Sequence, residues 1–292
     1  MGTPAPLICS IGDLIADVVV RLDRDPRRGT DTPARIERVR GGSAANVCAA
    51  VVAGGGQARF IGQVGNDAEG ANLKESLLAS GVEGHITSRG TTGAIVVLVD
   101  ASGERSFLTD RGAAVHLSFV DPGVLEGVDA LHVPLYSLLT GALAESTQIL
   151  IGEAIERQIP VTLATSSVAA LEEFGRQEFL ALVKSLKPAL VFANLPESRY
   201  VLQGHPWFVG AGATVVTSGA GVARATRPDG SDYRRKPDVV DVVDTTGAGD
   251  AFTAGFLVDW CGGADLGDCL DAGHRLAQRC LGSAGAEVGA EA

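Results

Sequence analysis

The segment DTTGAGD, residues 244–250, joins a glycine-bearing turn to a carboxylate. Gly247 and Gly249 free the backbone to turn sharply and to approach a ligand closely. The next helix is expected to begin near Ala248 or Gly249, so its unpaired N–H groups and the positive end of its dipole would form an anion site. Asp250 falls in the first turn of that helix. Its carboxylate could accept a proton from a hydroxyl group that attacks a bound phosphoryl group.

The same segment also has a plainer interpretation. The apolar run at 239–243 predicts a buried strand directly before the turn. Asp250 would then be only an acid that stabilises the dipole of the following helix. Short motifs also occur by chance, so this segment alone leaves both interpretations open.

A second pair of glycines occurs in RGGSAANV, residues 40–47. Gly41 and Gly42 would let a ligand meet bare backbone, and the amide of Asn46 offers both a donor and an acceptor. The alternative is an ordinary loop before a helix, with Ser43 as the N-cap residue.

Most of the 292 residues alternate between apolar strands and helices. This alternation is typical of a parallel sheet covered by helices on both faces, and no linker divides the chain, so we expect one domain over 1–292. The expected strands are 7–12, 58–62, 129–133, 160–164, 189–193, 213–217 and 239–243, and the expected helices are 44–53, 69–80, 141–157, 170–185, 249–260 and 266–282.

Four short segments do not fit the alternation: 16–22, 34–40, 94–99 and 104–109. Strands without intervening helices predict a small antiparallel sheet that projects from the main one. An open α/β sheet binds its ligands at the carboxyl ends of its strands. We therefore expect a lid there, formed by residues of about 14–40 and 93–111.

Composition excludes several classes of protein. The formal net charge of -11 argues against non-specific binding to nucleic acid. The five cysteines are odd in number and form no C-x-x-C pair, as expected in a reducing compartment. The first apolar stretch, 7–20, contains Asp13 and Asp17, so it predicts a strand and not a signal peptide or membrane span. We expect a cytoplasmic protein with no membrane partner.

Common nucleotide and hydrolase signatures do not occur in the sequence. It contains no G-x-x-x-x-G-K-S/T, no G-x-G-x-x-G, no G-x-S-x-G and no H-E-x-x-H. A P-loop and the main dinucleotide fingerprint are therefore excluded, and DTTGAGD must bind any phosphate through its own backbone.

Taken together, the motifs resemble the ribokinase, or PfkB, family of carbohydrate and nucleoside kinases. GGSAAN is similar to the N-terminal signature of this family, and DTTGAGDAFTAGF is similar to the C-terminal one. Between them, FANLPES resembles the N-x-x-E element, and VVTSGAG resembles the strand end that borders the nucleotide. The resemblance extends in order from about residue 7 to 287. It implies a ribokinase-like three-layer α/β/α domain with a mainly parallel central sheet and a small β-sheet lid.

The resemblance implies a catalytic role for the turn before the last two helices. Asp250 matches the catalytic base, and Gly247, Ala248 and Gly249 match the anion hole for the transferred phosphoryl group. Asp250 needs no raised pKa, because a well-placed ionised carboxylate suffices where the acceptor loses its proton late.

The resemblance also implies a nucleotide site and a magnesium site. Asn194 and Glu197 match the element that arranges Mg²⁺ and phosphate waters, with Glu197 reaching the metal through water. Four further residues match positions around the nucleotide: Thr217 and Gly219 at its border, and His274 and Ala277 near the adenine.

On the acceptor side, Asp17 matches the carboxylate that binds sugar hydroxyls, and Gly42 and Asn46 match its partners. Arg111 is a candidate cation on the acceptor or phosphate side. Tyr136 stands where ribokinase has a sugar-binding glutamate, so the acceptor need not be ribose.

The function that the resemblance implies is ATP-dependent transfer of the γ-phosphoryl group to a hydroxyl of a small sugar or sugar derivative, with Mg²⁺. Two alternatives stay open: a nucleoside kinase, in which Tyr136 stacks on a base, and a non-catalytic member that binds sugar or nucleotide. The dependence on a monovalent cation such as K⁺ is also open, because the chain ends soon after Glu287. Family members often pair through their lids, so a homodimer through the lid is expected.

Overall fold

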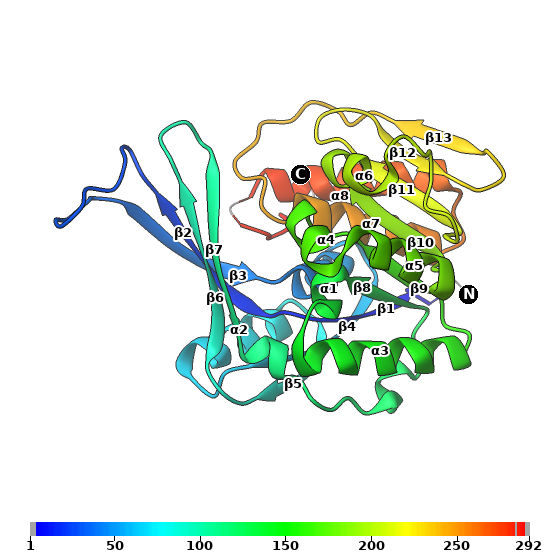
Figure 1. Ribbon diagram of the computed structural model, residues 1–292, viewed down its shortest axis with the longest axis horizontal. Helices are drawn as coiled ribbons and strands as arrows, with labels where there is room; N and C mark the ends of the chain where they lie inside the picture. Colours follow the sequence, from blue (N-terminus) through cyan, green and yellow to red (C-terminus); the bar gives the residue numbers. More distant parts are fainter. Residues whose placement is uncertain (1–3, 284, 290–292) are drawn as a thin grey trace.

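The computed structural model describes residues 4–283 and 285–289. Its main body is a nine-stranded sheet in the order β13-β12-β11-β10-β9-β8-β1-β4-β5, between two layers of helices (Figure 1). All pairs from β11 to β5 are parallel, and only β12 and β13 are antiparallel to their neighbours. The strands are β1 Leu7–Ile11, β4 Gln57–Val64, β5 Glu83–Ser88, β8 Ala130–Pro134, β9 Val161–Ala164, β10 Leu190–Asn194, β11 Ala213–Thr217, β12 Ala223–Thr226 and β13 Asp232–Arg235.

Two hydrophobic cores lie on opposite faces of this sheet. Successive strand residues enter different cores: Ile8 packs in one and Cys9 in the other, because side chains alternate along a strand. The core with Ile8 is covered by α1 Ser43–Ala53, α2 Ala68–Ala79, α7 Ala248–Cys261 and α8 Leu266–Leu281. The core with Cys9 is covered by α3 Gly141–Glu156, α4 Val168–Phe174, α5 Arg176–Leu186 and α6 Leu195–Leu202. The expected three-layer architecture with a mainly parallel sheet is confirmed.

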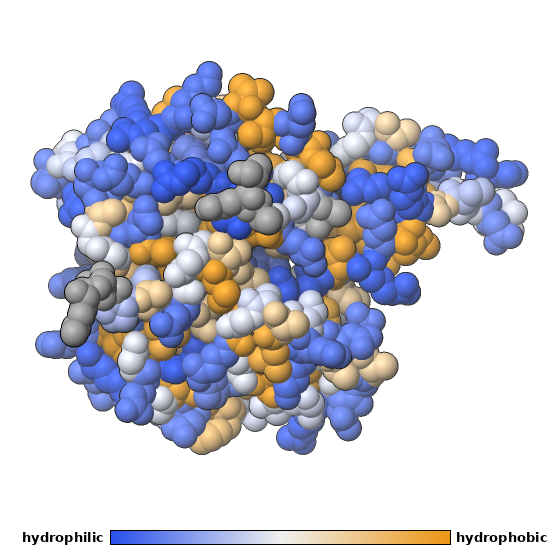
Figure 2. Space-filling view, turned by 180° about the vertical axis from the view of Figure 1, so that it is seen from behind, coloured by the Kyte–Doolittle hydropathy of each residue, from blue (hydrophilic) through white to orange (hydrophobic). Residues whose placement is uncertain are grey.

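Four strands form a separate sheet in the order β3-β2-β6-β7, called the small sheet below. Its strands are β2 Ile15–Arg21, β3 Arg35–Gly41, β6 Thr92–Val99 and β7 Arg105–Gly112. The small sheet projects from the main body in Figure 1, and Figure 2 shows it as an arm on the right whose end is mostly hydrophilic. The expectation of an antiparallel sheet is wrong for its central pair, because β2 and β6 are parallel. These strands belong to two different hairpins, so no tight turn sets their relative direction.

The buried strand expected at 239–243 is not formed. Val239 is 95% exposed and Val243 is 63% exposed. The segment runs beside the end of α8, where the Val243 amide donates to the Leu281 carbonyl at 2.8 Å and the Gln278 side chain donates to the Asp238 carbonyl at 3.0 Å. The edge of the sheet beyond β11 is occupied by β12 and β13 instead. The apolar run therefore predicted a buried strand, but the main sheet has no free edge there for such a strand to join.

The helix expected at 170–185 is divided at Gly175 into α4 and α5, because Gly175 has φ +93° and cannot continue a helix. Sequence analysis also missed α6, β5, β12 and β13. The described residues also form three short 3₁₀ helices: η1 Ala113–His116, η2 Pro122–Leu125 and η3 Leu135–Leu138. Within the described residues, no helix is long and apolar enough to cross a membrane.

Gly42 occupies a backbone position that only glycine fits. Its φ is +103°, and a Cβ built there would lie 2.1 Å from the Asp13 carbonyl oxygen. Gly55 has a similar φ of +88°, but a Cβ there would meet no atom within 4 Å. Comparing alanine at these two positions therefore separates the cost of backbone strain from the cost of steric conflict.

We expect Gly42→Ala to lower the free energy of unfolding more than Gly55→Ala. Both variants carry strain of about 1–3 kcal/mol, and Gly42→Ala adds overpacking of about 1–3 kcal/mol. Urea unfolding followed by circular dichroism measures both. Equal losses would mean that the Asp13 loop moves aside without cost.

Candidate active site

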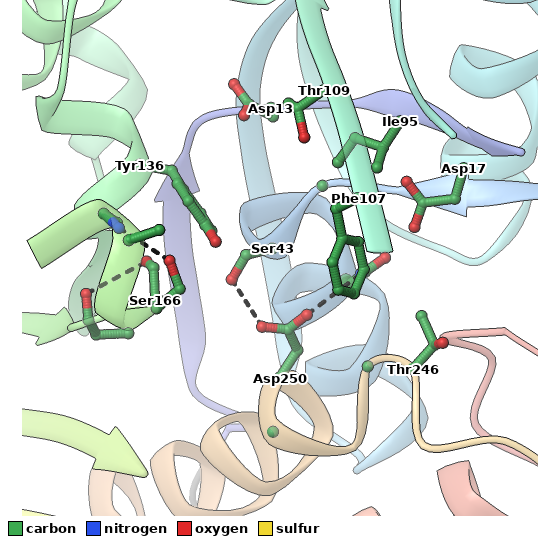
Figure 3. A pocket seen from close by; sticks show the side chains of 18 of the residues that line it. Asp13, Asp17, Ser43, Ile95, Phe107, Thr109, Tyr136, Ser166, Thr246 and Asp250 are labelled. Carbon is green, nitrogen blue, oxygen red and sulfur yellow. Dashed lines mark hydrogen bonds between the residues drawn. The ribbon is translucent and has the colours of Figure 1, made fainter. Parts of the chain in front are cut away.

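One cavity of about 740 Å³ lies between the small sheet and the carboxyl ends of the main-sheet strands (Figure 3). The small sheet presents one face to it, since every lining residue from its strands is odd-numbered. The other walls come from the start of α1, the turn before α7 and the segments after β8, β9, β10 and β11. Lining residues from the small sheet are Ile15, Asp17, Val19, Ile95, Val97, Arg105, Phe107, Thr109 and Arg111.

Asp250 lies in the first turn of α7, as expected, and points into the cavity (Figure 3). Its Oδ1 accepts a hydrogen bond from Ser43 Oγ at 2.7 Å. Its Oδ2 accepts one from Asn46 Nδ2 at 3.2 Å. Ser43 is not the N-cap of α1, since Gly42 holds that position and makes no side-chain cap. The first turn of α1 instead orients the carboxylate of α7.

Two aspartates of the cavity have raised pKa values. Burial raises the pKa of the Asp250 carboxyl to about 6, and the hydrogen bonds from Ser43 and Asn46 oppose this rise. Burial, and then the nearby charge of Asp250, raises the pKa of Asp17 to about 6. The shift of Asp250 was not expected. At pH 7 a carboxyl with such a pKa is still mostly ionised, so Asp250 can accept a proton.

The turn at 244–249 leaves backbone bare where a ligand could bind. Gly247 has φ +76°, and a Cβ there would lie 2.4 Å from the Ala286 Cβ, so this position requires glycine. Gly249 lines the cavity, and a Cβ there would meet no protein atom within 4 Å. Glycine at 249 therefore leaves room for something other than protein. The N–H groups of the first turn of α7 suit an anion at this point.

Two oxygens in the cavity wall have no partner among the described residues. Asp17 Oδ1 and Asn46 Oδ1 are buried and accept no hydrogen bond there. Gly41 lacks a side chain where a Cβ would lie 2.2 Å from Asp17 Oδ1, which leaves space for the carboxylate. Buried acceptors normally have partners, so these two are suited to ligand hydroxyls.

Arg111 lines the cavity, but its charge is already paired. Its Nε and Nη2 donate to Asp13 Oδ2 and Oδ1 at 2.8 and 2.7 Å. Such a two-point contact neutralises both groups and fixes their orientation. Arg111 is thus no free cation, and only its Nη1 is left buried without a partner in the described part of the chain.

Tyr136 lies in η3 and lines the cavity. Burial raises the pKa of its hydroxyl above the usual value. Figure 3 shows Tyr136 and Phe107 on opposite sides of the space above Asp250. Phe107 is 61% exposed, and Tyr136 is half-buried. The cavity therefore has a partly uncovered aromatic ring on each side.

Asn194 and Glu197 form a capping box at the start of α6. Asn194 Oδ1 accepts from the Glu197 amide at 2.9 Å, and Glu197 Oε2 accepts from the Asn194 amide at 2.8 Å. Burial raises the pKa of Glu197, while hydrogen bonds from Thr165 and Asn194 oppose this. Both side chains line the cavity, although each is already used to stabilise the helix.

The described residues contain no group of three or more His, Cys, Asp or Glu side chains placed to hold a metal ion. Mg²⁺ usually takes only one or two carboxylates together with waters and substrate phosphates. Glu197 at the cavity wall fits this limited role, because a carboxylate with four lone-pair sites can still accept from a metal-bound water.

The cavity brings together most of the expected site residues, but not all of them. Thr217, at the end of β11, lines it. His274 packs edge-on against Phe252, with ring centroids 5.2 Å apart, between α8 and α7. Four expected residues do not line it: Ala248, Gly219, His274 and Ala277.

Sequence reasoning missed three functional candidates: Asp13, Ser43 as a partner of Asp250, and Arg105. Asp13 was visible only as a charge in an apolar stretch, and Ser43 only as a helix-start residue. Arg105 gave no local signal, since its partners Asp244 and Thr246 are 139 and 141 residues away.

The whole chain has relatives of known class. It matches the family described as pfkB family carbohydrate kinase over residues 5–292. The chain therefore belongs to the pfkB family of carbohydrate kinases. An ATP-dependent ribose-1-phosphate kinase of Halopiger xanaduensis is 31% identical over 289 residues, which cover 96% of this chain and 93% of the relative.

Solved structures of the same fold agree with the architecture. Adenosine kinase from Sinorhizobium meliloti aligns with a TM-score of 0.85 at 24% identity, over 98% of this chain and 96% of that one. A putative ribokinase II from E. coli, in complex with ATP and Mg²⁺, aligns with a TM-score of 0.83 at 18% identity and the same coverage. By its family, the chain is an ATP-dependent phosphotransferase that acts on a hydroxyl of a sugar.

The raised pKa values predict an acid limit to activity. We expect kcat/KM to fall as the pH drops through about 6, because protonated Asp250 cannot accept a proton. Asp17 and Asp250 interact, so the measured values belong to the pair. Asp17→Asn removes the neighbouring negative charge and should move this limb to lower pH.

The pH profiles of wild type, Asp17→Asn and the control Asp23→Asn test this expectation. Asp23 is exposed in the loop after β2 and does not line the cavity. An acid limb at the same pH in all three proteins would show that the two carboxylates do not interact during the reaction.

Proposed function

We propose that Asp250 is the base that takes the proton of the acceptor hydroxyl while the turn at 247–249 holds the phosphoryl group. The observation that carries this proposal is the convergence, in one cavity, of an oriented carboxylate, a bare glycine turn at a helix start and two unpartnered acceptor oxygens. Phosphoryl transfer needs positioning and charge stabilisation more than covalent catalysis. These groups supply both, with Ala248 between the two glycines of the anion hole.

On the phosphate side, we propose that Asn194 and Glu197 orient the waters around Mg²⁺. When bound, Mg²⁺ neutralises negative charge on the phosphate oxygens. The capping box supports this role because it holds both side chains in one orientation at the cavity wall. Glu197 acts through water, since both of its oxygens already accept hydrogen bonds.

For the nucleotide, we propose a site that continues from Thr217 toward Gly219 and α8. Gly219 lies in an exposed turn after β11, and a Cβ there would meet no atom within 4 Å. His274 and Ala277 on α8 would then lie near the adenine. The small residues at 219 and 277 suit a flat ring that packs closely on the protein.

We propose that the acceptor is a neutral polyhydroxylated sugar or sugar derivative that Asp17, Gly42 and Asn46 bind. Asp17 and Asn46 offer free oxygens, which suit hydroxyl donors. The arginines that line the cavity, Arg105 and Arg111, are both paired with carboxylates. Among the described residues that line the cavity, no cation is therefore left unpaired to bind an anionic acceptor. The small sheet, which covers this side, acts as the lid of a single kinase domain.

A nucleoside is the second candidate acceptor. The supporting observation is the aromatic pair of Tyr136 and Phe107, which flank the space above Asp250 (Figure 3). Aromatic rings stack on a flat base, and such stacking contributes about 1–3 kcal/mol per base. A simple sugar would leave much of this apolar surface uncovered.

The experiment that tests the proposal measures ADP release over ketoses, aldoses, sugar acids and nucleosides. We expect Asp250→Asn to lower kcat about 10²–10⁴-fold with the accepted compound, because Asn keeps the shape but removes the base. Nucleotide binding, measured by calorimetry, should change little.

The outcomes separate the alternatives. Retention of more than about a tenth of wild-type kcat would make Asp250 only a helix-capping acid. Turnover of nucleosides but not sugars would select the second candidate, and nucleotide binding without turnover of any acceptor would indicate a non-catalytic member.

We also propose a homodimer formed through the small sheet. By register, Ile36 and Leu108 lie on the face away from the cavity, and they are 57% and 59% exposed. Val18 and Val20 lie between them on the same face and are half-buried. An apolar sheet face of this kind is stabilised by a second copy.

The free cysteines fit a reducing compartment, and we place the protein in the cytoplasm.

Sedimentation equilibrium at micromolar concentration tests the dimer. We expect Leu108→Lys to shift wild-type dimer to monomer, because a charge on the outer face opposes burial. Phe107→Lys on the cavity face is the matched control and should leave the dimer intact. A wild-type monomer would contradict the proposal.

A further inference from the structure

The glycine turn is anchored by a buried carboxylate at its first residue, Asp244, which is 5% exposed. Asp244 Oδ1 accepts from the Thr246 amide at 2.9 Å and from Thr246 Oγ1 at 2.8 Å. These short-range bonds fold the turn onto itself just before Gly247. A buried carboxylate also needs a positive partner, because an unpaired buried charge is costly.

That partner comes from the small sheet. Arg105 Nη2 donates to Asp244 Oδ1 at 2.8 Å, and Arg105 Nη1 donates to Thr246 Oγ1 at 3.1 Å. Burial raises the pKa of Asp244, but the hydrogen bonds from Thr246 and Arg105 outweigh it and lower the pKa to about 2. The carboxylate is therefore ionised, its Oδ1 is bound to the turn and to Arg105, and its Oδ2 accepts from the Gly285 amide at 3.4 Å.

Strand register explains why Arg105 reaches the turn. Arg21, Val99 and Arg105 are successive partners across β2, β6 and β7, so their side chains leave the same face of the small sheet. Arg21 Nη2 lies 3.6 Å from Asp244 Oδ2, and its side chain is more exposed than that of Arg105. Arg105 alone also bonds Thr246, so it makes the tighter and more directional contact.

The two ends of β7 are both fixed to other parts of the molecule. Near its end, Arg111 is paired with Asp13 in the loop after β1. At its start, Arg105 is paired with Asp244. Within the described residues β7 is an edge strand that pairs with β6 alone, so these ion pairs and that ladder together hold it over the cavity.

We propose that Arg105 is a positioning residue that joins the small sheet to the glycine turn, so that closure of the sheet and the shape of the anion hole depend on each other. The inference rests on the proposed role of the turn at 247–249 as the phosphoryl site. Arg105 and Thr246 both line the cavity beside Gly247 and Gly249. Loss of the guanidinium removes the donor to Thr246 Oγ1 and leaves Arg21, at 3.6 Å, as the one cation paired with Asp244 among the described residues. The turn then loses its fixed geometry.

The test compares Arg105→Gln and Arg105→Lys with the control Arg38→Gln. Arg38 is exposed on β3, and its register places it on the opposite face of the small sheet. Hydrogen–deuterium exchange of the amides at 244–249, in the ligand-free protein, reports the turn without any need for activity. We expect faster exchange in Arg105→Gln, partial recovery in Arg105→Lys, which keeps the charge but not the two-point geometry, and no change in Arg38→Gln.

Kinetics with the accepted acceptor complete the test. We expect Arg105→Gln to lower kcat about ten- to a hundredfold, the effect of losing one buried charge-assisted hydrogen bond, with a smaller change in KM. In a double-mutant cycle, Asp244→Asn should add little to Arg105→Gln, because both remove the same contact.

Each outcome has a distinct meaning. Unchanged exchange at 244–249 would overturn the inference, as would a lower Tm with normal kcat per folded molecule and normal exchange. Faster exchange with unchanged kcat would confirm the contact but contradict the assignment of the glycine turn to the phosphoryl group.

Discussion

The contact between the first turns of α1 and α7 is the interaction on which the site depends. Ser43 and Asn46 from α1 hold the carboxylate of Asp250 from α7 and orient it in the cavity beside the bare glycine turn. Both helices begin after a glycine with positive φ, Gly42 and Gly247. A Cβ at Gly42 would meet the Asp13 carbonyl and one at Gly247 would meet Ala286, so each helix start requires glycine against its own neighbour. Burial and these hydrogen bonds act in opposite directions on the pKa of Asp250, and the balance leaves it ionised at neutral pH.

The small sheet completes this site through charges that are paired within the protein. Arg111 is neutralised by Asp13 and Arg105 by Asp244, so the arginines serve to hold β7 over the cavity. Between them the wall is largely apolar, which excludes water from the reacting groups once an acceptor is bound. Such a wall and the unpartnered oxygens of Asp17 and Asn46 suit hydroxyl-bearing acceptors. The same arrangement makes the glycine turn sensitive to the position of the small sheet.

Local signals predicted the layers but not every element. Periodic apolar segments located most of the parallel strands and most helices, since these signals depend on residues a few positions apart. The valines at 239–243 led to the wrong prediction of a buried strand, because apolar character does not indicate whether the sheet has a free edge. The break at Gly175 and the helix α6 were missed for a similar reason. A glycine inside a helical pattern and a short capped segment after a strand both have several local solutions, and packing selects one.

The sequence by itself determined the family, the glycine turn at a helix start and the carboxylate that follows it, because glycine spacing and a first-turn acid act over a few residues. Only the tertiary structure decided which groups meet across the chain. Ser43 reaches Asp250 over 207 residues, and Arg105 reaches Asp244 over 139. Such contacts arise from the order of strands and the register of a sheet, and neither is encoded in the local pattern around any one residue. The raised pKa values also depend on the tertiary structure, because these carboxyl groups are buried only once the helices and sheets have packed together.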